Sequence, residues 1–182
     1  MACFFHVSFS SALMSMALIF LSVIPSSICH QVNENDLVNI CSKTHDASEC
    51  LNLFKSDPRS LNTDEKGLAG VAIDLALKKA DATHTQYNQL YSDSRDYELQ
   101  EKYNSCSKNY NDAIRDLKEV KNELDNNRNK LIHVEINDAL EEINTCIRAF
   151  ERDQIDPVQM NYHNLQFKLL CYMVKFTTES LV

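Results

Sequence analysis

The sequence predicts an all-α protein: an antiparallel four-helix bundle with an N-terminal helical hairpin and two disulfides. The first observation is composition, because the 182 residues include only two glycines, Gly67 and Gly70, and three prolines. Sheets and tight turns usually need more of both, since glycine allows positive φ and proline fixes φ. The second is that apolar residues recur at helical spacing along four long segments. The third is that two of the cysteines lie within these apolar series.

The first 29 residues have the pattern of a secretory signal peptide. Residues 13–24 are mostly apolar, and no charged residue precedes Glu34. This run is shorter than the roughly 20 residues that a membrane span needs, and Ser27 and Cys29 fit cleavage after Cys29. A retained anchor and a buried core helix are the alternatives. We expect a secreted chain of residues 30–182 without membrane contact, with the hairpin in 30–60 and the bundle in 61–182.

The predicted mature chain is acidic. It contains all 26 acidic and 18 basic residues, which gives a net charge of −8. An acidic surface does not suit nucleic acid, whose phosphates need Lys and Arg to neutralise them. It suits a basic partner, or it simply keeps a small secreted protein soluble.

Four apolar stripes define the predicted bundle helices. Short polar links separate them at 92–96, 125–130 and Asp156-Pro157. Amphipathic helices with such short links bury their stripes against each other in an up-down-up-down bundle. The stripes are Ala69, Ala72, Ile73, Ala76, Ala80, Tyr87 and Leu90; Leu99, Tyr103, Cys106, Tyr110, Ala113, Leu117, Val120 and Leu124; Ile132, Ile136, Ala139, Ile143, Cys146 and Phe150; and Val158, Tyr162, Leu165, Leu169, Tyr172 and Phe176.

The five cysteines after the signal segment are expected to form two disulfides, since the context is secretory. Cys106 and Cys146 lie in the stripes of adjacent antiparallel helices, so we predict that they are bonded. Cys41 and Cys50 flank a polar turn at 44–48 in a separate short region, and a bond there would hold a hairpin too short to be stable alone. Cys171 lies one position off the fourth stripe and is expected to be a buried free thiol.

Motifs for catalysis and cofactors are not found in the sequence. With one pair of glycines, it cannot contain a dinucleotide-binding loop, a Walker loop or a nucleophile elbow. The nearest approach to a di-iron motif is Asp81-x-x-His84, which has no matching second pair. Carboxylate pairs such as Glu141-Glu142 are interpreted as a solvated face. We therefore expect no enzyme activity, no cofactor and no metal.

Short motifs around the cysteines suggest a family. In chain order they are Ile40-Cys41, Cys50-Leu51, Asp57-Pro58-Arg59-Ser60, Gly67-Leu68-Ala69 with Ala72-Ile73, Cys106 with Tyr110, and Ala139-Leu140 with Thr145-Cys146. In this order they resemble the plant invertase and pectin methylesterase inhibitors, over nearly all of the mature chain. A Gly-Leu pair after the Asp57-Pro58-Arg59-Ser60 segment, here Gly67-Leu68, resembles the sequences of the pollen-allergen-like branch, whose members are described as invertase inhibitors. The resemblance implies a four-helix bundle with an N-terminal hairpin, bridged first-to-second and third-to-fourth cysteine, which agrees with the pairing inferred above.

The resemblance also implies a function. Members of this family are non-enzymatic inhibitors of cell-wall or vacuolar carbohydrate enzymes. The link 126–131 lacks the Pro-Lys-Phe segment of some invertase inhibitors. We therefore expect an apoplastic inhibitor of pectin methylesterase that covers the active-site cleft in a reversible complex. The alternative is an acid invertase inhibitor, with the vacuole as a less favoured location. A further alternative, of a different class, is a small-ligand carrier or storage protein with a cavity between its helices.

Overall fold

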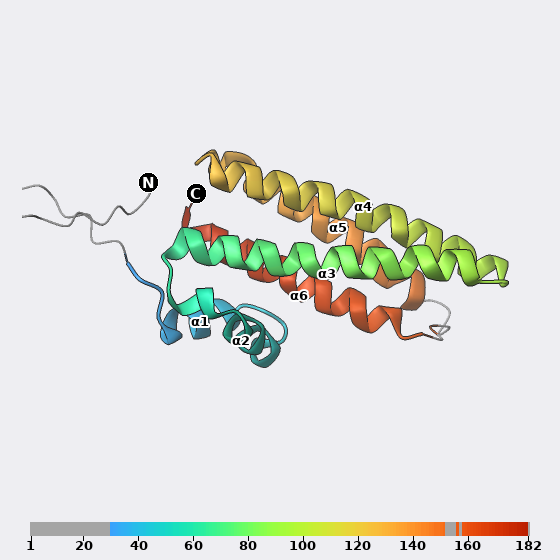
Figure 1. Ribbon diagram of the computed structural model, residues 1–182, viewed down its shortest axis with the longest axis horizontal. Coiled ribbons are helices and arrows are strands. Elements are labelled where there is room, and N and C mark those ends of the chain that lie inside the picture. Colours follow the sequence, from blue (N-terminus) through green and yellow to red (C-terminus); the bar gives the residue numbers. More distant parts are fainter. Residues whose placement is uncertain (1–29, 152–155, 157, 182) are drawn as a thin grey trace, which may run out of the picture. The chain divides into compact units, whose positions relative to one another are not determined.

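The computed structural model describes residues 30–151, 156 and 158–181, so the expected signal peptide lies outside the described residues. From Gln31 onward, the regular secondary structure of the described residues is helical, apart from one isolated antiparallel bridge between Gln31 and Asp64 (Figure 1). The α-helices are α1 (Glu34–Cys41), α2 (Ala47–Ser56), α3 (Glu65–Asp93), α4 (Tyr97–Asp125), α5 (Ile132–Glu151) and α6 (Met160–Thr178); the 3-10 helices are η1 (Pro58–Leu61), η2 (Asn129–Leu131) and η3 (Glu179–Leu181).

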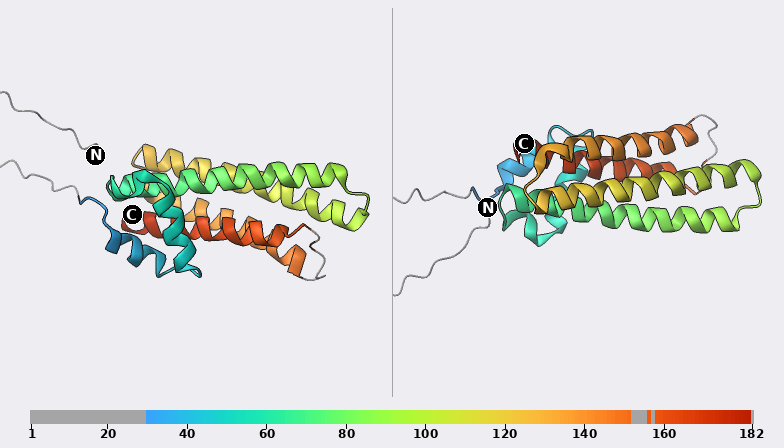
Figure 2. Two further views of the ribbon diagram at one scale, coloured as in Figure 1. Left: turned by 60° about the horizontal axis from the view of Figure 1, so that its bottom comes forward. Right: turned by 90° about the horizontal axis from the view of Figure 1, so that it is seen from above.

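Helices α3 to α6 form an antiparallel four-helix bundle (Figures 1 and 2). The pairs that pack along their lengths are α3 with α4, α4 with α5, α5 with α6 and α6 with α3. Spatial order around the bundle therefore follows chain order, as short links require. The predicted all-α bundle is confirmed. No helix in the described ranges is both long enough and apolar enough to span a bilayer.

The short helices α1 and α2 pack against each other and form the predicted hairpin. Both also contact α6 (Figure 2). Lys43, just after α1, forms an ion pair of 3.1 Å with Glu179 in η3. Helix α6 is therefore packed on two sides, by the bundle and by the hairpin.

Acidic or amide side chains begin most of the helices. Each accepts hydrogen bonds from backbone N–H groups in the first turn, which have no partner within the helix. The acceptors are Asn33 for α1, Asp46 for α2, Asp57 for η1, Asp64 for α3 and Asp96 for α4. Asp156 plays this part for α6, because its two carboxylate oxygens accept from the N–H groups of Met160 and Asn161, each at 2.7 Å.

Three of the four predicted stripes form the bundle core. Every residue of the stripes on α3, α4 and α5 is buried, except Leu90 and Leu99, which are partly buried. The prediction for α6 is wrong in part. Leu169 is buried as predicted, but Val158, Tyr162 and Leu165 are exposed. The series that faces the bundle core is instead Met160, Asn164, Phe167, Cys171, Val174 and Thr178. The reason is that α6 carries a second apolar face, which contributes Tyr172 and Phe176 to the hairpin side.

Candidate functional site

The structure brings the predicted cysteine pairs together. The Cys41–Cys50 disulfide joins α1 to α2, with Cα atoms 5.5 Å apart. The Cys106–Cys146 disulfide joins α4 to α5, with Cα atoms 5.3 Å apart. Cys171 is a free, fully buried thiol on the core face of α6, and burial raises its pKa well above the ordinary value. It lies on the core stripe rather than one position off it, so its sulfur packs as a small apolar group.

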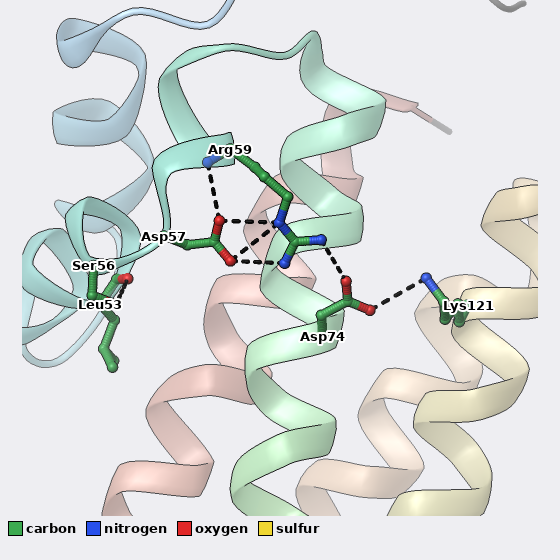
Figure 3. Close-up of polar contacts among 6 residues, drawn as sticks. All are labelled: Leu53, Ser56, Asp57, Arg59, Asp74 and Lys121. Atoms are coloured by element: carbon green, nitrogen blue, oxygen red, sulfur yellow. Dashed lines mark hydrogen bonds and ion pairs between the residues drawn. The ribbon is translucent and has the colours of Figure 1, made fainter.

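The Asp57-Pro58-Arg59-Ser60 motif forms a charge network at the base of the hairpin (Figure 3). The Arg59 guanidinium donates from Nε and Nη2 to the Asp57 carboxylate, with distances of 3.0 Å and 2.7 Å. Its Nη1 donates to Asp74 of α3 at 2.9 Å. The other oxygen of Asp74 pairs with Lys121 of α4 at 3.3 Å. Hydrogen bonds from Arg59 hold the pKa of Asp57 below its usual range.

This network therefore connects η1 to two bundle helices. Pro58 occupies the first turn of η1, where a backbone N–H would have no partner within the helix. The missing N–H of proline therefore costs no hydrogen bond there. Gly67, in another of the motifs, is required for space, since a Cβ there would collide with the Thr63 hydroxyl. These motif residues hold the hairpin and the start of α3 in place, and none of them forms a catalytic arrangement.

A row of carboxylates lines the outer seam between α4 and α5. The spacing of four and three residues keeps each set beside the core stripe of its own helix. The side-chain amide of Asn109 donates to the backbone carbonyl of Glu142 at 3.4 Å, which links the two helices at one end of the row. This α4–α5 carboxylate row consists of Asp112, Asp116 and Glu119 from α4 and Glu135, Asp138 and Glu142 from α5.

The carboxylates of this row repel one another. Burial, followed by the charges of Asp116 and Asp138, raises the pKa of Glu135. Burial, followed by Asp112 and Asp116, raises that of Glu142. Burial also raises the pKa of Asp116, although Arg115 beside it acts in the opposite direction.

Arg115 offsets part of this negative charge. Its guanidinium donates to Asp112 at 2.7 Å and to Asp116 at 3.2 Å. One guanidinium cannot neutralise six carboxylates, so the row keeps an excess of negative charge. A partner that brings Lys or Arg to this seam would relieve the repulsion, and such complementarity speeds association and selects the partner.

Two apolar side chains extend the seam, Leu131 at the end of η2 and Val134 in the first turn of α5. Leu131 is 51% exposed and Val134 is 52% exposed. At helical spacing, Leu131 and Val134 continue the α5 side of the carboxylate row, which is formed by Glu135, Asp138 and Glu142. The seam thus combines charged and apolar groups, as protein-binding surfaces do.

This seam was not predicted from the sequence. The Glu141-Glu142 pair was expected to form a solvated face, whereas Glu142 is half-buried. The signal was available, because carboxylates at 112, 116, 119 and 135, 138, 142 repeat the spacing of the apolar stripes. Among the described residues, no group of three or more His, Cys, Asp or Glu side chains has the geometry to hold a metal ion.

Comparison with known proteins identifies the family. The model of the plant invertase/pectin methylesterase inhibitor family matches residues 35–177. The chain belongs to this family. It is 34% identical over 167 residues to a pectinesterase inhibitor from Actinidia deliciosa, an alignment that covers 91% of this chain and 90% of the relative. It is 26% identical to the cell wall / vacuolar inhibitor of fructosidase 2 from Arabidopsis thaliana, covering 78% and 81% of the two chains.

The fold also matches that of a solved family member. The crystal structure of a mutant form of a pectin methylesterase inhibitor from Arabidopsis superposes with a TM-score of 0.72 at 22% identity. The match covers 79% of this chain and 95% of the other. The helical hairpin and bundle are therefore the fold of the family.

Proposed function

We propose that this chain is a protein inhibitor of pectin methylesterase that acts by forming a reversible complex over the active-site cleft. The observation that carries the proposal is the similarity to the Actinidia pectinesterase inhibitor, which spans nine-tenths of both chains. An inhibitor of this kind works by steric exclusion of substrate, so it needs a rigid surface rather than a reactive group. A disulfide-linked bundle provides such a surface.

Acid invertase is the alternative target. Fructosidase inhibitors are also among the relatives, but their alignments cover less of this chain than that of the Actinidia inhibitor does. The link at 126–131 also lacks the Pro-Lys-Phe segment of some invertase inhibitors. Both observations favour pectin methylesterase.

We further propose that the chain is secreted to the apoplast and has no catalytic activity of its own. The apolar N-terminal segment and the family membership support secretion. Within the part of the chain that the structure describes, the free thiol is that of Cys171, and burial raises its pKa, which is the opposite of an activated nucleophile. Incubation of the purified chain with methylated pectin and with sucrose tests this proposal. Turnover that persists after removal of contaminating hydrolases would contradict it.

The α4–α5 carboxylate row is the proposed contact surface. Its excess negative charge suits a basic surface on the target, and Leu131 and Val134 supply apolar area at one end. A single exposed ion pair contributes only about 0–1 kcal/mol. The row would therefore act collectively, and no one carboxylate should dominate the affinity.

Charge reversal in the row tests this surface. Glu135→Lys/Glu142→Lys should slow association with pectin methylesterase and weaken inhibition about tenfold at low salt, because the row loses its charge complementarity to a basic target surface. The matched control is Asp81→Lys/Glu101→Lys, which changes net charge equally at exposed positions on α3 and α4. Equal loss of inhibition in both variants would reject the row as the contact surface, and so would no loss in either.

A further inference from the structure

A groove between the hairpin and the bundle has the features of a small-molecule site. It lies between α2, α3 and α6 and has a volume of about 390 Å³. This volume is within the range of roughly 300–1,000 Å³ that is usual for ligand pockets. Its walls include Leu53 of α2, Leu75 and Ala82 of α3, and Leu170 of α6. The groove is thus mainly apolar and open to solvent on one side.

Two lysines line the groove, the exposed Lys78 and the partly buried Lys79, and Lys79 has neutral hydrogen-bond partners. The Lys79 ammonium donates to Nδ1 of His163 at 2.9 Å and to Oε1 of Gln166 at 2.6 Å. Both acceptors are neutral: burial and the charge of Lys79 lower the pKa of His163, and Gln166 does not titrate. An ammonium has three N–H donors. The third has no acceptor within the described parts of the chain.

The position of Lys79 is fixed by the groups around it. Gln166 cannot rotate freely, because its amide Nε2 donates to the Tyr162 hydroxyl at 2.7 Å. Since an ammonium only donates, Nδ1 of His163 must accept and its proton lies on Nε2. Partial burial also lowers the pKa of Lys79 itself, so its charge is poorly solvated. Such a positioned and under-solvated cation favours an anionic ligand group.

The α2 wall of the groove is also held in place. The Ser56 hydroxyl donates to the carbonyl of Leu53 at 2.7 Å, and the Arg59 network begins one residue later at Asp57 (Figure 3). Glu49, one turn before Leu53, contributes a carboxylate to the lining. Glu49 offsets one of the two lysine charges, Lys78 and Lys79, so the lining keeps one net positive charge. The groove therefore suits a ligand with a single carboxylate.

We propose that this groove binds a small monocarboxylate with an apolar body. The carboxylate accepts the third N–H of Lys79, and the apolar body lies against Leu53, Leu75 and Leu170. The charge complementarity and the apolar walls together define this ligand class. The site uses α2, α3 and α6, so it is separate from the α4–α5 carboxylate row. It would give the chain a binding activity besides inhibition.

The test uses octanoate, below the concentration at which it forms micelles, and octanol as a neutral analogue. Amide NMR of the mature chain should show saturable shifts at α2, α3 and α6 residues of the groove on titration with octanoate. Lys79→Gln should weaken octanoate binding at least tenfold, while octanol binding changes less than threefold. Ala82→Trp, which fills the groove from an exposed position, should reduce the binding of both. Lys118→Gln, on the exposed side of α4, is the matched control and should change neither.

Two results would overturn the proposal. One is the absence of groove shifts at millimolar octanoate in a chain that circular dichroism shows to be folded. The other is equal octanoate affinity in Lys79→Gln and the parent. Ala82→Trp should still inhibit pectin methylesterase as the parent does. Failure of the groove proposal is thus measured separately from failure of the inhibitor proposal.

Discussion

The hydroxyl of Tyr87 in α3 donates a 2.9 Å hydrogen bond to Oδ1 of Asn164 in α6, inside the bundle. The hydroxyl of Tyr110 in α4 donates to the same oxygen at 3.0 Å. Asn164 is fully buried, and an amide oxygen can accept two such bonds. Burial raises the pKa of both tyrosines, so both hydroxyls remain protonated donors. The side-chain amide of Asn164 therefore links α3, α4 and α6 at one height along the bundle.

Replacing Asn164 should destabilise the bundle strongly. Asn164→Leu leaves two buried hydroxyls without their acceptor, and each unsatisfied group costs about 1–3 kcal/mol. The substitution also removes Nδ2 of Asn164, which is buried without a partner among the described residues, and this removal offsets part of the cost. We expect the free energy of unfolding to fall by about 2–4 kcal/mol in urea denaturation followed by circular dichroism.

The triple variant Tyr87→Phe/Tyr110→Phe/Asn164→Leu provides the control. It removes donors and acceptor together, so no polar group is left unpaired at this level. It should recover at least half of the lost stability. A triple variant less stable than Asn164→Leu would show that packing at this site, rather than hydrogen bonding, sets the cost.

The same asparagine explains what the sequence could not predict about α6. Periodicity located the core faces of α3, α4 and α5, because each has one apolar stripe. Helix α6 has two apolar faces, and its core face includes the polar residues Asn164 and Thr178. The purely apolar series that begins at Val158 is the clearer pattern in the sequence. Only knowledge of where the hairpin packs distinguishes the two faces.

The disulfide pairing gives a direct chemical prediction. Peptide mapping under non-reducing conditions should link Cys41 to Cys50 and Cys106 to Cys146, and alkylation of the folded chain should spare Cys171. The chain-entropy model assigns about 4 kcal/mol to the 40-residue loop and about 2.6 kcal/mol to the 9-residue loop. Cys106→Ala/Cys146→Ala should therefore unfold at lower urea than Cys41→Ala/Cys50→Ala. A peptide linking Cys171 to any other cysteine would refute this pairing.

The carboxylate row should make stability depend on pH. Burial and neighbouring charges raise the folded-state pKa of Glu135 and Glu142 above the unfolded value near 4.5. Their contribution to stability is therefore full below that pH and is lost as the pH rises through the folded-state pKa. Glu135→Gln/Glu142→Gln removes both titrations, so its melting temperature should exceed that of the parent at pH 7.

This stability difference should shrink to nearly zero as the pH falls toward 4, where both glutamates are protonated in the parent. Glu101→Gln, at an exposed position of α4, is the control and should show a much smaller difference at either pH. A difference that stays constant between pH 4 and pH 7 would mean that the two substitutions act through packing instead of charge.

The candidate surfaces were only partly predictable from the sequence. The carboxylates of the row follow from helical spacing, but their mutual repulsion depends on how α4 and α5 face each other. The groove at Lys79 could not be predicted, since its walls come from residues as distant in the chain as Leu53 and Leu170. Local patterns define elements, whereas such sites depend on the packing between elements.

The most direct test of the inhibitor proposal is a titration of purified pectin methylesterase with the refolded mature chain. Acid invertase is titrated in parallel, and circular dichroism verifies that the chain is helical. We expect pectin methylesterase activity to fall to a plateau at a one-to-one molar ratio and to return on dilution, while invertase keeps its activity. Full activity of both enzymes at micromolar concentrations of the folded chain would contradict the proposed function.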